Sequence, residues 1–404
     1  MKLLFAHDNI FLKYDNIYFD GYGAFPSDVL KRYTSVFETV NFVSRQKQVS
    51  SKSENFTPAS TERVEFINIE NFKTLKTFYR ILEAKKKIEE EVNKVDCVIA
   101  RLPSSIGYIA VNAAVKNNIP YAVEVVGCPW DSLWNYGNIE GKILAPYEFM
   151  KMKKIVKKAP FVLYVTDTFL QERYPTRGVT INCSNVEIIR PQNEVLESRQ
   201  INNQRFNKNK VIKIGMIGSL GSRFKGFDLA MEAIKNLSET YKNIELHILG
   251  SGDKVVWEKY ARELGVEDKV FFVGTLPSGK AVLEWLDEIN IYIQPSKQEG
   301  LPRALIEAMS RGCPAVGSNT AGIPELLDEE FIHKKGDSID LANKIEQLIA
   351  SKKIKLQQSE RNFHFANNYS KDVLDKRRAD YYMNFKENVE KINLKEYEDG
   401  VSSP

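Results

Sequence analysis

Residues 294–317 read QPSKQEGLPRALIEAMSRGCPAVG, and this stretch indicates the fold. A strand ends at Gln294, a loop carries Glu299, and a helix is predicted to begin near Pro302, where a proline suits helix entry. The short apolar run Pro314–Gly317 is the next strand. A strand, a helix and a strand in this order predict a parallel βαβ unit.

The start of the predicted helix is suited to an anion. Free N–H groups and the helix dipole favour negative charge there, so a diphosphate could bind without a metal. The carboxylate of Glu307, farther along the helix, can accept two hydrogen bonds from a vicinal diol such as a ribose. Two glutamates eight residues apart are common by chance, however, and alone they equally fit a solvated helix start.

Strand-length apolar runs alternate with helical patterns on both sides of this stretch. The alternation predicts an α/β fold with two tandem Rossmann-like αβα domains facing each other across a cleft. The expected N-terminal domain covers 1–192, a polar segment without periodicity over 193–209 is the expected linker, and the second domain covers 210–370. A helix with a tail, 371–404, is expected to cross back to the N-terminal domain.

The loop Glu299-Gly300-Leu301-Pro302 and Glu307 resemble the E-x7-E region of the retaining family-4 glycosyltransferases, which have the GT-B fold. This resemblance implies that Glu299 contacts the donor hexose and that Glu307 contacts the nucleotide ribose. It also implies that the helix start at Gly300, Leu301 and Pro302 stabilises the departing diphosphate.

A second stretch, residues 215–228, reads GMIGSLGSRFKGFD. In the same family this strand is followed by a G-R-L loop and a K-G pair, whose two cations neutralise the donor pyrophosphate. Lys225-Gly226 matches the pair, but Ser219 stands where the arginine is expected. Arg223 either supplies the missing charge or is a solvated loop cation.

The glycines of this second stretch also permit a dinucleotide-binding interpretation. Their spacing is GxxGxxG, however, and the next strand does not finish on an acidic residue that would hold an adenosine ribose. We therefore expect no nicotinamide nucleotide and no other cofactor.

Further donor contacts implied by the resemblance lie in loops that follow strands. Gly218, Ser219 and Gly250 would shape the donor cleft, although Gly250 could equally serve only a tight turn. The backbone of Gly274, Thr275 and Leu276 would contact the nucleobase.

Candidates for the acceptor side lie in the first half of the chain. Gly21 and Gly23 follow a predicted hairpin over Phe11–Phe19 that turns at Asp15-Asn16. Asp131 either bonds a sugar hydroxyl or caps the helix that follows it. His7, at the end of the first predicted strand, is either structural or a proton carrier.

Composition excludes several classes of protein. The 404 residues are 43% hydrophobic and 27% charged, which is typical of a globular chain. The four cysteines and four histidines form no metal-binding pattern, and no apolar run approaches a membrane span. A net charge of +4 is too small for a nucleic-acid footprint. The chain is expected to be cytoplasmic.

Positive charge is concentrated in residues 151–158, which read KMKKIVKK. This run is either a solvated helix face or a basic amphipathic helix that contacts anionic lipid, which would make the protein peripheral on the inner face of the plasma membrane.

Taken with the resemblance, these features predict a metal-independent, retaining glycosyltransferase. It would move a hexose-type residue from a UDP- or GDP-type sugar to a glycan or lipid-linked acceptor, in bacterial surface polysaccharide synthesis. A sugar-nucleotide epimerase of the same architecture and a non-catalytic nucleotide-sugar binding protein are the alternatives.

Overall fold

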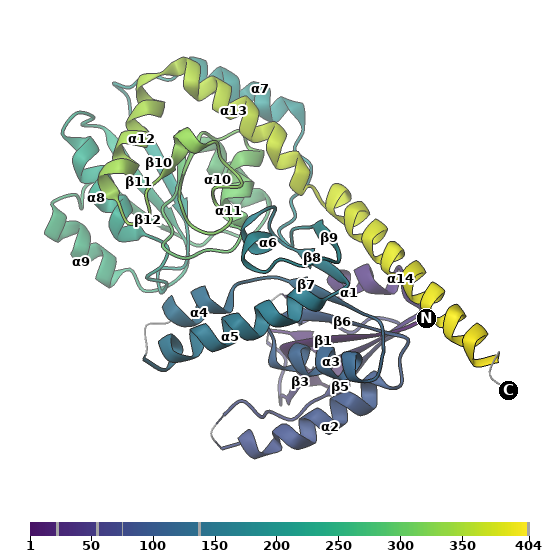
Figure 1. Ribbon diagram of the computed structural model, residues 1–404. Coiled ribbons are helices and arrows are strands. Elements are labelled where there is room, and N and C mark those ends of the chain that lie inside the picture. The colour runs from purple at the N-terminus through teal and green to yellow at the C-terminus, as the bar shows by residue number, and fades with distance from the viewer. Residues whose placement is uncertain (22–23, 54–55, 75, 136–138, 402–404) are drawn as a thin grey trace. The chain divides into compact units, whose positions relative to one another are not determined.

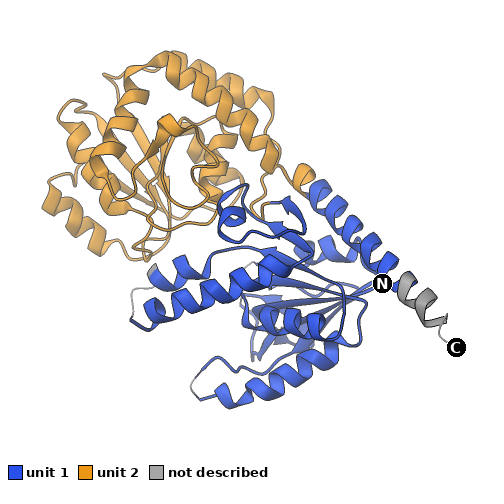
Figure 2. Ribbon diagram, in the orientation of Figure 1, with its two compact units in different colours: residues 1–183, 375–404 blue, residues 184–374 orange. Residues whose placement is uncertain are grey.

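The computed structural model describes residues 1–21, 24–53, 56–74, 76–135 and 139–401. The chain divides into two compact units, residues 1–183 with 375–404 and residues 184–374 (Figure 2). Each unit contains a largely parallel sheet covered by helices (Figure 1), so the predicted pair of Rossmann-like domains is confirmed.

The sheet of unit 1 is centred on its first strand, β1. The parallel strands follow the order β5-β3-β1-β6-β7-β8-β9, while β2 pairs antiparallel with the second half of β1 and β4 pairs with β2. The strands are β1 Lys2–Tyr14, β2 Ile17–Asp20, β3 Thr39–Gln48, β4 Thr57–Pro58, β5 Val64–Asn68, β6 Cys97–Leu102, β7 Tyr121–Val125, β8 Phe161–Tyr164 and β9 Val179–Asn182.

The predicted β1–β2 hairpin is confirmed. Tyr14 pairs with Ile17 across the turn, and the two turn residues, Asp15 and Asn16, have φ angles of 46° and 60°. Asp and Asn tolerate this left-handed conformation better than most residues, which explains why they occupy a two-residue turn.

Helices cover both faces of the unit 1 sheet (Figure 1). In the lysine- and glutamate-rich segment 72–92, regular α-helix begins only at Ile81, after a single 3-10 turn. The helices are α1 Ser27–Thr34, η1 Phe78–Arg80, α2 Ile81–Val92, α3 Ser105–Lys116, α4 Pro129–Asn135, α5 Ile139–Lys158, α6 Phe169–Arg173 and, from the C-terminal segment, α14 Lys371–Val401.

A buried ion pair attaches α14 to the core of unit 1. Arg101 and Glu124 are register partners on β6 and β7, and Arg101 Nε donates to Glu124 Oε2 at 2.6 Å. Tyr33 Oη, at 2.7 Å, and Tyr382 Oη of α14 both donate to Glu124 Oε1. Burial alone raises the pKa of Glu124, but Arg101 and the two phenols hold it below its usual value.

The sheet of unit 2 has the order β12-β11-β10-β13-β14-β15, and its described pairs are parallel. Its strands are β10 Ile212–Ile217, β11 Ile244–Leu249, β12 Val270–Gly274, β13 Ile291–Gln294, β14 Ala315–Ser318 and β15 Ile332–His333. Its helices are α7 Asn193–Gln204, α8 Phe227–Ser238, α9 Val255–Leu264, α10 Lys280–Glu288, α11 Arg303–Ser310, η2 Glu329–Phe331, α12 Ser338–Ala350, α13 Lys352–Ala366 and η3 Asn367–Tyr369.

The segment expected as a linker, 193–209, differs from that expectation because it contains helix α7. The buried side chain of Arg199 ties this helix to unit 2, donating to the backbone carbonyls of Leu286, Ile289 and Arg311 at 2.6 to 3.0 Å. The buried residues of α7 are the polar Arg199 and Asn203, not an apolar stripe, so periodicity in the sequence did not indicate the helix.

None of the helices in the described ranges combines the length and the apolar character needed to cross a membrane.

Candidate functional site

Two loops of unit 2 meet at the carboxyl edge of its sheet. The first follows β10 and the second follows β13, and these strands are hydrogen-bonded neighbours. Lys225, at the end of the first loop, places Nζ 2.8 Å from Glu299 Oε2 in the second loop. The loops that follow parallel strands are where ligands of such sheets bind, so the structure brings together two residues that the sequence selected separately.

A polar chain beneath Glu299 fixes its carboxylate. Ser296 Oγ donates to Glu299 Oε2 at 2.9 Å and Gln294 Nε2 approaches the same oxygen at 3.3 Å. Tyr292 Oη donates to Gln294 Oε1 at 2.8 Å. Among the described residues no donor reaches the second oxygen, Oε1, so Glu299 is oriented through one oxygen and can accept hydrogen bonds through the other.

Sequence analysis did not select Tyr292, Gln294 or Ser296. All are buried, at the end of a strand that points toward the loop of Glu299. A polar Gln-Pro-Ser sequence at the end of a buried strand was the available signal, because buried polar groups require partners.

Glycines allow the backbones of these loops to approach one another closely. Gly226 has a φ of +79°, and a Cβ there would lie 2.1 Å from the carbonyl oxygen of Pro295. At Gly250, after β11, a Cβ would lie 1.9 Å from the carbonyl oxygen of Gly218. Neither position has room for a side chain, so both glycines are required for the loop arrangement.

A further pair of contacts connects the same loops. The Lys297 backbone N–H donates to the Phe224 carbonyl at 2.7 Å, and its ammonium group is paired with Asp228. These contacts hold the chain at Phe224, before Lys225, and at Asp228, after it.

The helix that follows Glu299 begins one residue after Pro302, near which the sequence predicts its start. Helix α11 starts at Arg303, and Pro302 is its N-cap, with φ −77° and ψ 112°. No side chain in the described ranges caps this end, whereas Asp337 caps α12 and Ser351 caps α13. The first amides of α11 are thus left without a side-chain acceptor, which suits an anionic ligand.

Glu307 lies on the second turn of α11 and is partly buried. Burial raises the pKa of its carboxyl group, and the nearby Arg303 only partly opposes this. Within the described part of the chain its carboxylate receives no hydrogen bond, so its acceptor capacity is unused.

The other donor-side candidates lie along the same sheet edge. The Gly218 N–H donates to the Leu249 carbonyl at 3.0 Å, and the Gly250 N–H donates to the Gly274 carbonyl at 2.7 Å. These bonds link the loops after β10, β11 and β12, which carry Ser219, Thr275 and Leu276 as well. Arg223 is exposed and has no ion-pair partner among the described residues.

Acceptor-side candidates belong to unit 1. Gly21 directly follows β2, while Gly23 lies outside the described residues. Asp131 is the third residue of α4 and not its cap, and it pairs with Arg173 at 2.8 Å. His7 Nδ1 accepts the Asn9 N–H at 3.1 Å, and burial, aided by Arg101, lowers the pKa of His7 to about 3. A neutral, bonded imidazole fits the structural alternative.

The neighbour of His7, Asp8, was missed by sequence analysis. Its carboxylate accepts the N–H of Ser105 at 2.7 Å, at the start of α3, and pairs with Lys73 at 2.6 Å. Burial raises the pKa of Asp8, but Lys73 and the amide bond outweigh that effect and lower it. This helix start is therefore already occupied by a side chain, unlike that of α11.

Two Rossmann-like units are the architecture of the GT-B glycosyltransferases, and the chain belongs to the family of glycosyl transferases group 1. Residues 197–364 match that family. Protein CapJ of Staphylococcus aureus is 34% identical over 404 residues, covering 98% of both chains. The amylovoran biosynthesis glycosyltransferase AmsK of Erwinia amylovora is 37% identical over 128 residues, 29% of this chain and 31% of AmsK.

Solved structures agree on the fold. Sucrose-phosphate synthase of Thermosynechococcus elongatus superposes with a TM-score of 0.64 at 14% identity, covering 96% of this chain and 99% of that one. Anabaena HepE in complex with UDP gives a TM-score of 0.63 at 14% identity, covering 94% and 99%.

Proposed function

We propose that this chain transfers a hexose-type sugar from a nucleotide-sugar to a hydroxyl of a glycan or lipid-linked acceptor, with retention at the anomeric carbon, in bacterial surface polysaccharide synthesis. The observation that carries the proposal is the Lys225–Glu299 pair beside the uncapped start of α11. The names of two relatives support the biosynthetic setting: the amylovoran biosynthesis glycosyltransferase AmsK and WcaL of Escherichia coli, a putative colanic acid biosynthesis glycosyltransferase.

The donor would be a UDP- or GDP-type sugar. The solved HepE complexes contain UDP and UDP-glucose. In this chain Glu307 would accept both ribose hydroxyls, Glu299 Oε1 would accept a hexose hydroxyl, and the backbone from Gly274 to Leu276 would contact the base. Gly218, Ser219 and Gly250 would shape the remaining wall.

The chemistry requires stabilisation of a leaving diphosphate. As the bond from the anomeric carbon to the phosphate oxygen breaks, charge develops on that oxygen, and Lys225 with the α11 amides would stabilise it. Arg223 would add a second cation. The acceptor oxygen bonds to the anomeric carbon, and its proton passes to the departing phosphate. These groups would allow transfer without a metal ion.

Acceptor contacts would come from unit 1, where Gly21, Gly23 and Asp131 are the candidates. A lipid-linked acceptor would bring the protein to the inner face of the plasma membrane as a peripheral protein.

The test is a donor panel. UDP- and GDP-hexoses are first ranked by the rise in melting temperature that each produces, because a ligand of the folded state stabilises it. The best donor is then incubated with undecaprenyl-linked saccharides, and transfer, release of the nucleoside diphosphate and anomeric configuration are measured with and without EDTA. Transfer with retained configuration in EDTA is expected.

Three results would contradict the proposal in different ways. Isomerised sugar from the donor alone would indicate an epimerase. Tight donor binding without transfer to any saccharide would indicate a binding protein. Activity abolished by EDTA and restored by a divalent ion would contradict the metal-independent chemistry.

A further inference from the structure

Helix α5 of unit 1 exposes an apolar face to solvent. Five large apolar side chains between Ile139 and Met150 keep 50% or more of their surface exposed: Ile139, Ile143, Leu144, Tyr147 and Met150. The helix buries other positions, including Ala145, Met152 and Val156, against the rest of the unit. Its solvent face is therefore apolar where the outer face of a surface helix is normally polar.

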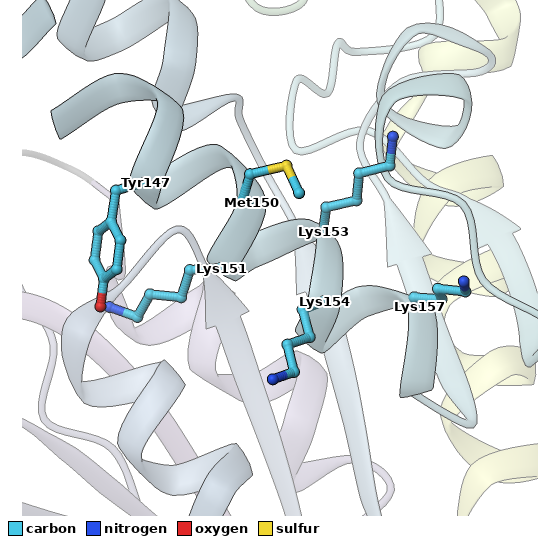
Figure 3. A pocket seen from close by; sticks show the side chains of 6 residues that line it. All are labelled: Tyr147, Met150, Lys151, Lys153, Lys154 and Lys157. Carbon is cyan, nitrogen blue, oxygen red and sulfur yellow. The ribbon is translucent and has the colours of Figure 1, made fainter. Parts of the chain in front are cut away.

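Cations gather on the second half of the same helix. Lys151, Lys153, Lys154 and Lys157 line an open pocket of about 580 Å³ together with Tyr147 and Met150 (Figure 3). Lys151 is paired with Glu148 at 3.3 Å. Among the described residues Lys153, Lys154 and Lys157 have no acidic partner, so their charge is available to an anion.

The balance of charge separates α5 from α2, the other lysine-rich helix of unit 1. Exposed apolar residues also precede α2, but that helix contains three lysines and four glutamates. Helix α5 contains six lysines and two glutamates. Of these two helices, α5 alone combines an exposed apolar face with a net positive charge.

A tryptophan adjoins this face. Trp134 of α4 is 43% exposed and stacks on Trp130 with ring centroids 5.2 Å apart. Lys142 Nζ of α5 lies 5.9 Å from the Trp134 ring centroid. An indole beside lysines is typical of groups at the boundary between lipid headgroups and acyl chains.

We propose that α5 and Trp134 dock unit 1 on a bilayer rich in anionic phospholipid. The apolar first half of α5 enters the headgroup region, and Lys153, Lys154 and Lys157 contact lipid phosphates. A polar partner would not compensate for the exposed apolar face, and a neutral one would not use the lysines. This binding does not depend on the sugar transfer proposed above.

Vesicle co-sedimentation tests the proposal with the full chain. Wild type is expected to pellet with vesicles containing about one third phosphatidylglycerol and to remain in solution with pure phosphatidylcholine, at an ionic strength of about 0.1 M. The triple variant Lys153→Gln, Lys154→Gln, Lys157→Gln should bind anionic vesicles about 100-fold more weakly, since each lysine near such a surface contributes about a factor of five.

A second variant tests the apolar part. Ile143→Ser with Met150→Ser should retain binding at low salt but lose the binding that wild type keeps at about 0.5 M salt, because screening removes only the electrostatic part. Matched controls in unit 2 are Lys352→Gln with Lys353→Gln, and Val255→Ser with Val256→Ser, all of which are exposed positions. These controls should bind as wild type does.

A fluorescence measurement tests the docking without any substitution in α5. Brominated phosphatidylglycerol should quench tryptophan fluorescence in wild type, and Trp134→Phe should remove most of that quenching. Equal binding of wild type to neutral and anionic vesicles, or unchanged binding of the triple lysine variant, would overturn the proposal. Absence of wild-type binding to either vesicle would also overturn it and would favour an acidic protein or glycan as the partner.

Discussion

Lys225 Nζ lies 2.8 Å from Glu299 Oε2, and the two residues come from loops 74 positions apart in sequence. Glu299 is also held by Ser296 and Gln294, so the carboxylate keeps its orientation without the lysine. A diphosphate would compete with this carboxylate for the ammonium group. The pair therefore holds Lys225 in position before a donor arrives.

Lys225→Ala should reduce kcat by about 100- to 1,000-fold, the effect of removing one group that stabilises developing negative charge. The melting temperature should fall only modestly, because Ser296 and Gln294 still bond the Glu299 carboxylate. Steady-state kinetics with the best donor measures the loss. Lys213→Ala is the matched control, since it removes a lysine–glutamate pair with Glu288 at 3.0 Å near the start of β10, the strand that precedes the loop of Lys225. This control should keep wild-type turnover.

Gly226→Ala should disrupt the loops that follow β10 and β13, which carry Lys225 and Glu299. Gly265 has a similar φ, +72° against +79°, but nothing lies within 4 Å of its Cβ position. Gly265→Ala should therefore cost about 1 kcal/mol from the backbone alone. Gly226→Ala adds a clash with Pro295 and should cost about 2 kcal/mol more. Urea unfolding checks this, and equal losses would contradict the close approach of the loops.

Glu307→Gln should affect stability and donor binding in opposite directions. Burial raises the pKa of this carboxyl group, so the folded chain favours the protonated form and ionisation at neutral pH opposes folding. The amide removes that penalty, and the melting temperature at pH 7 should rise. The KM for donor should also rise, since an amide cannot accept from both hydroxyls as a carboxylate does.

The control for that variant is Glu284→Gln, an exposed glutamate on α10, which should change neither quantity. An unchanged KM in Glu307→Gln would contradict the ribose contact. In wild type, donor binding should weaken as the pH falls through the raised pKa of Glu307.

Lys355 should make the stability of unit 2 depend on pH. Its side chain is fully buried over the Phe206 ring, with no hydrogen-bond partner among the described residues, and burial lowers its pKa to about 7. Between that value and the unfolded value of 10.5 the unfolded chain binds more protons, so wild-type stability should rise with pH.

Lys355→Met should be more stable than wild type at pH 7, and the difference should shrink by about 1 kcal/mol per pH unit toward pH 10. Urea unfolding at several pH values measures it. Lys352→Met, at an exposed position of the same helix, should show no such trend. A constant difference across this range would contradict the depressed pKa.

Tyr382→Phe should destabilise unit 1 by about 1 to 2 kcal/mol, because the buried Glu124 carboxylate loses one donor. The adjacent Tyr381 provides the control. Its hydroxyl is buried without a hydrogen-bond partner among the described residues, so Tyr381→Phe should be neutral or slightly stabilising. Thermal unfolding of the two variants should therefore differ, and equal losses would contradict the proposed contribution of the Glu124 bond.

Much of the fold could be predicted from the sequence, because apolar strands and local turn chemistry are visible in it. The Asp15-Asn16 turn is one example, and the strand that ends at Gln294 is another. Helix α7 could not be predicted in this way. The main tie of its polar segment to unit 2 is Arg199, whose partners are backbone carbonyls that no sequence pattern displays.

The candidate site was predictable as two separate loops but not as one arrangement. The Lys225–Glu299 distance depends on the pairing of β10 with β13, which lies outside local sequence. The orientation of Glu299 depends on Tyr292, Gln294 and Ser296, whose importance follows only from their burial. For Arg223, exposure and the lack of an ion pair in the described structure leave the charge free for a ligand.

The bond from Tyr382 to Glu124 also has a consequence for biosynthesis. Glu124 precedes unit 2 in the sequence, whereas Tyr382 follows it. The N-terminal unit therefore cannot complete its core until residue 382 has left the ribosome. Unit 2 is contiguous in sequence and can fold during translation. Unit 2 should therefore finish folding before unit 1 completes its core.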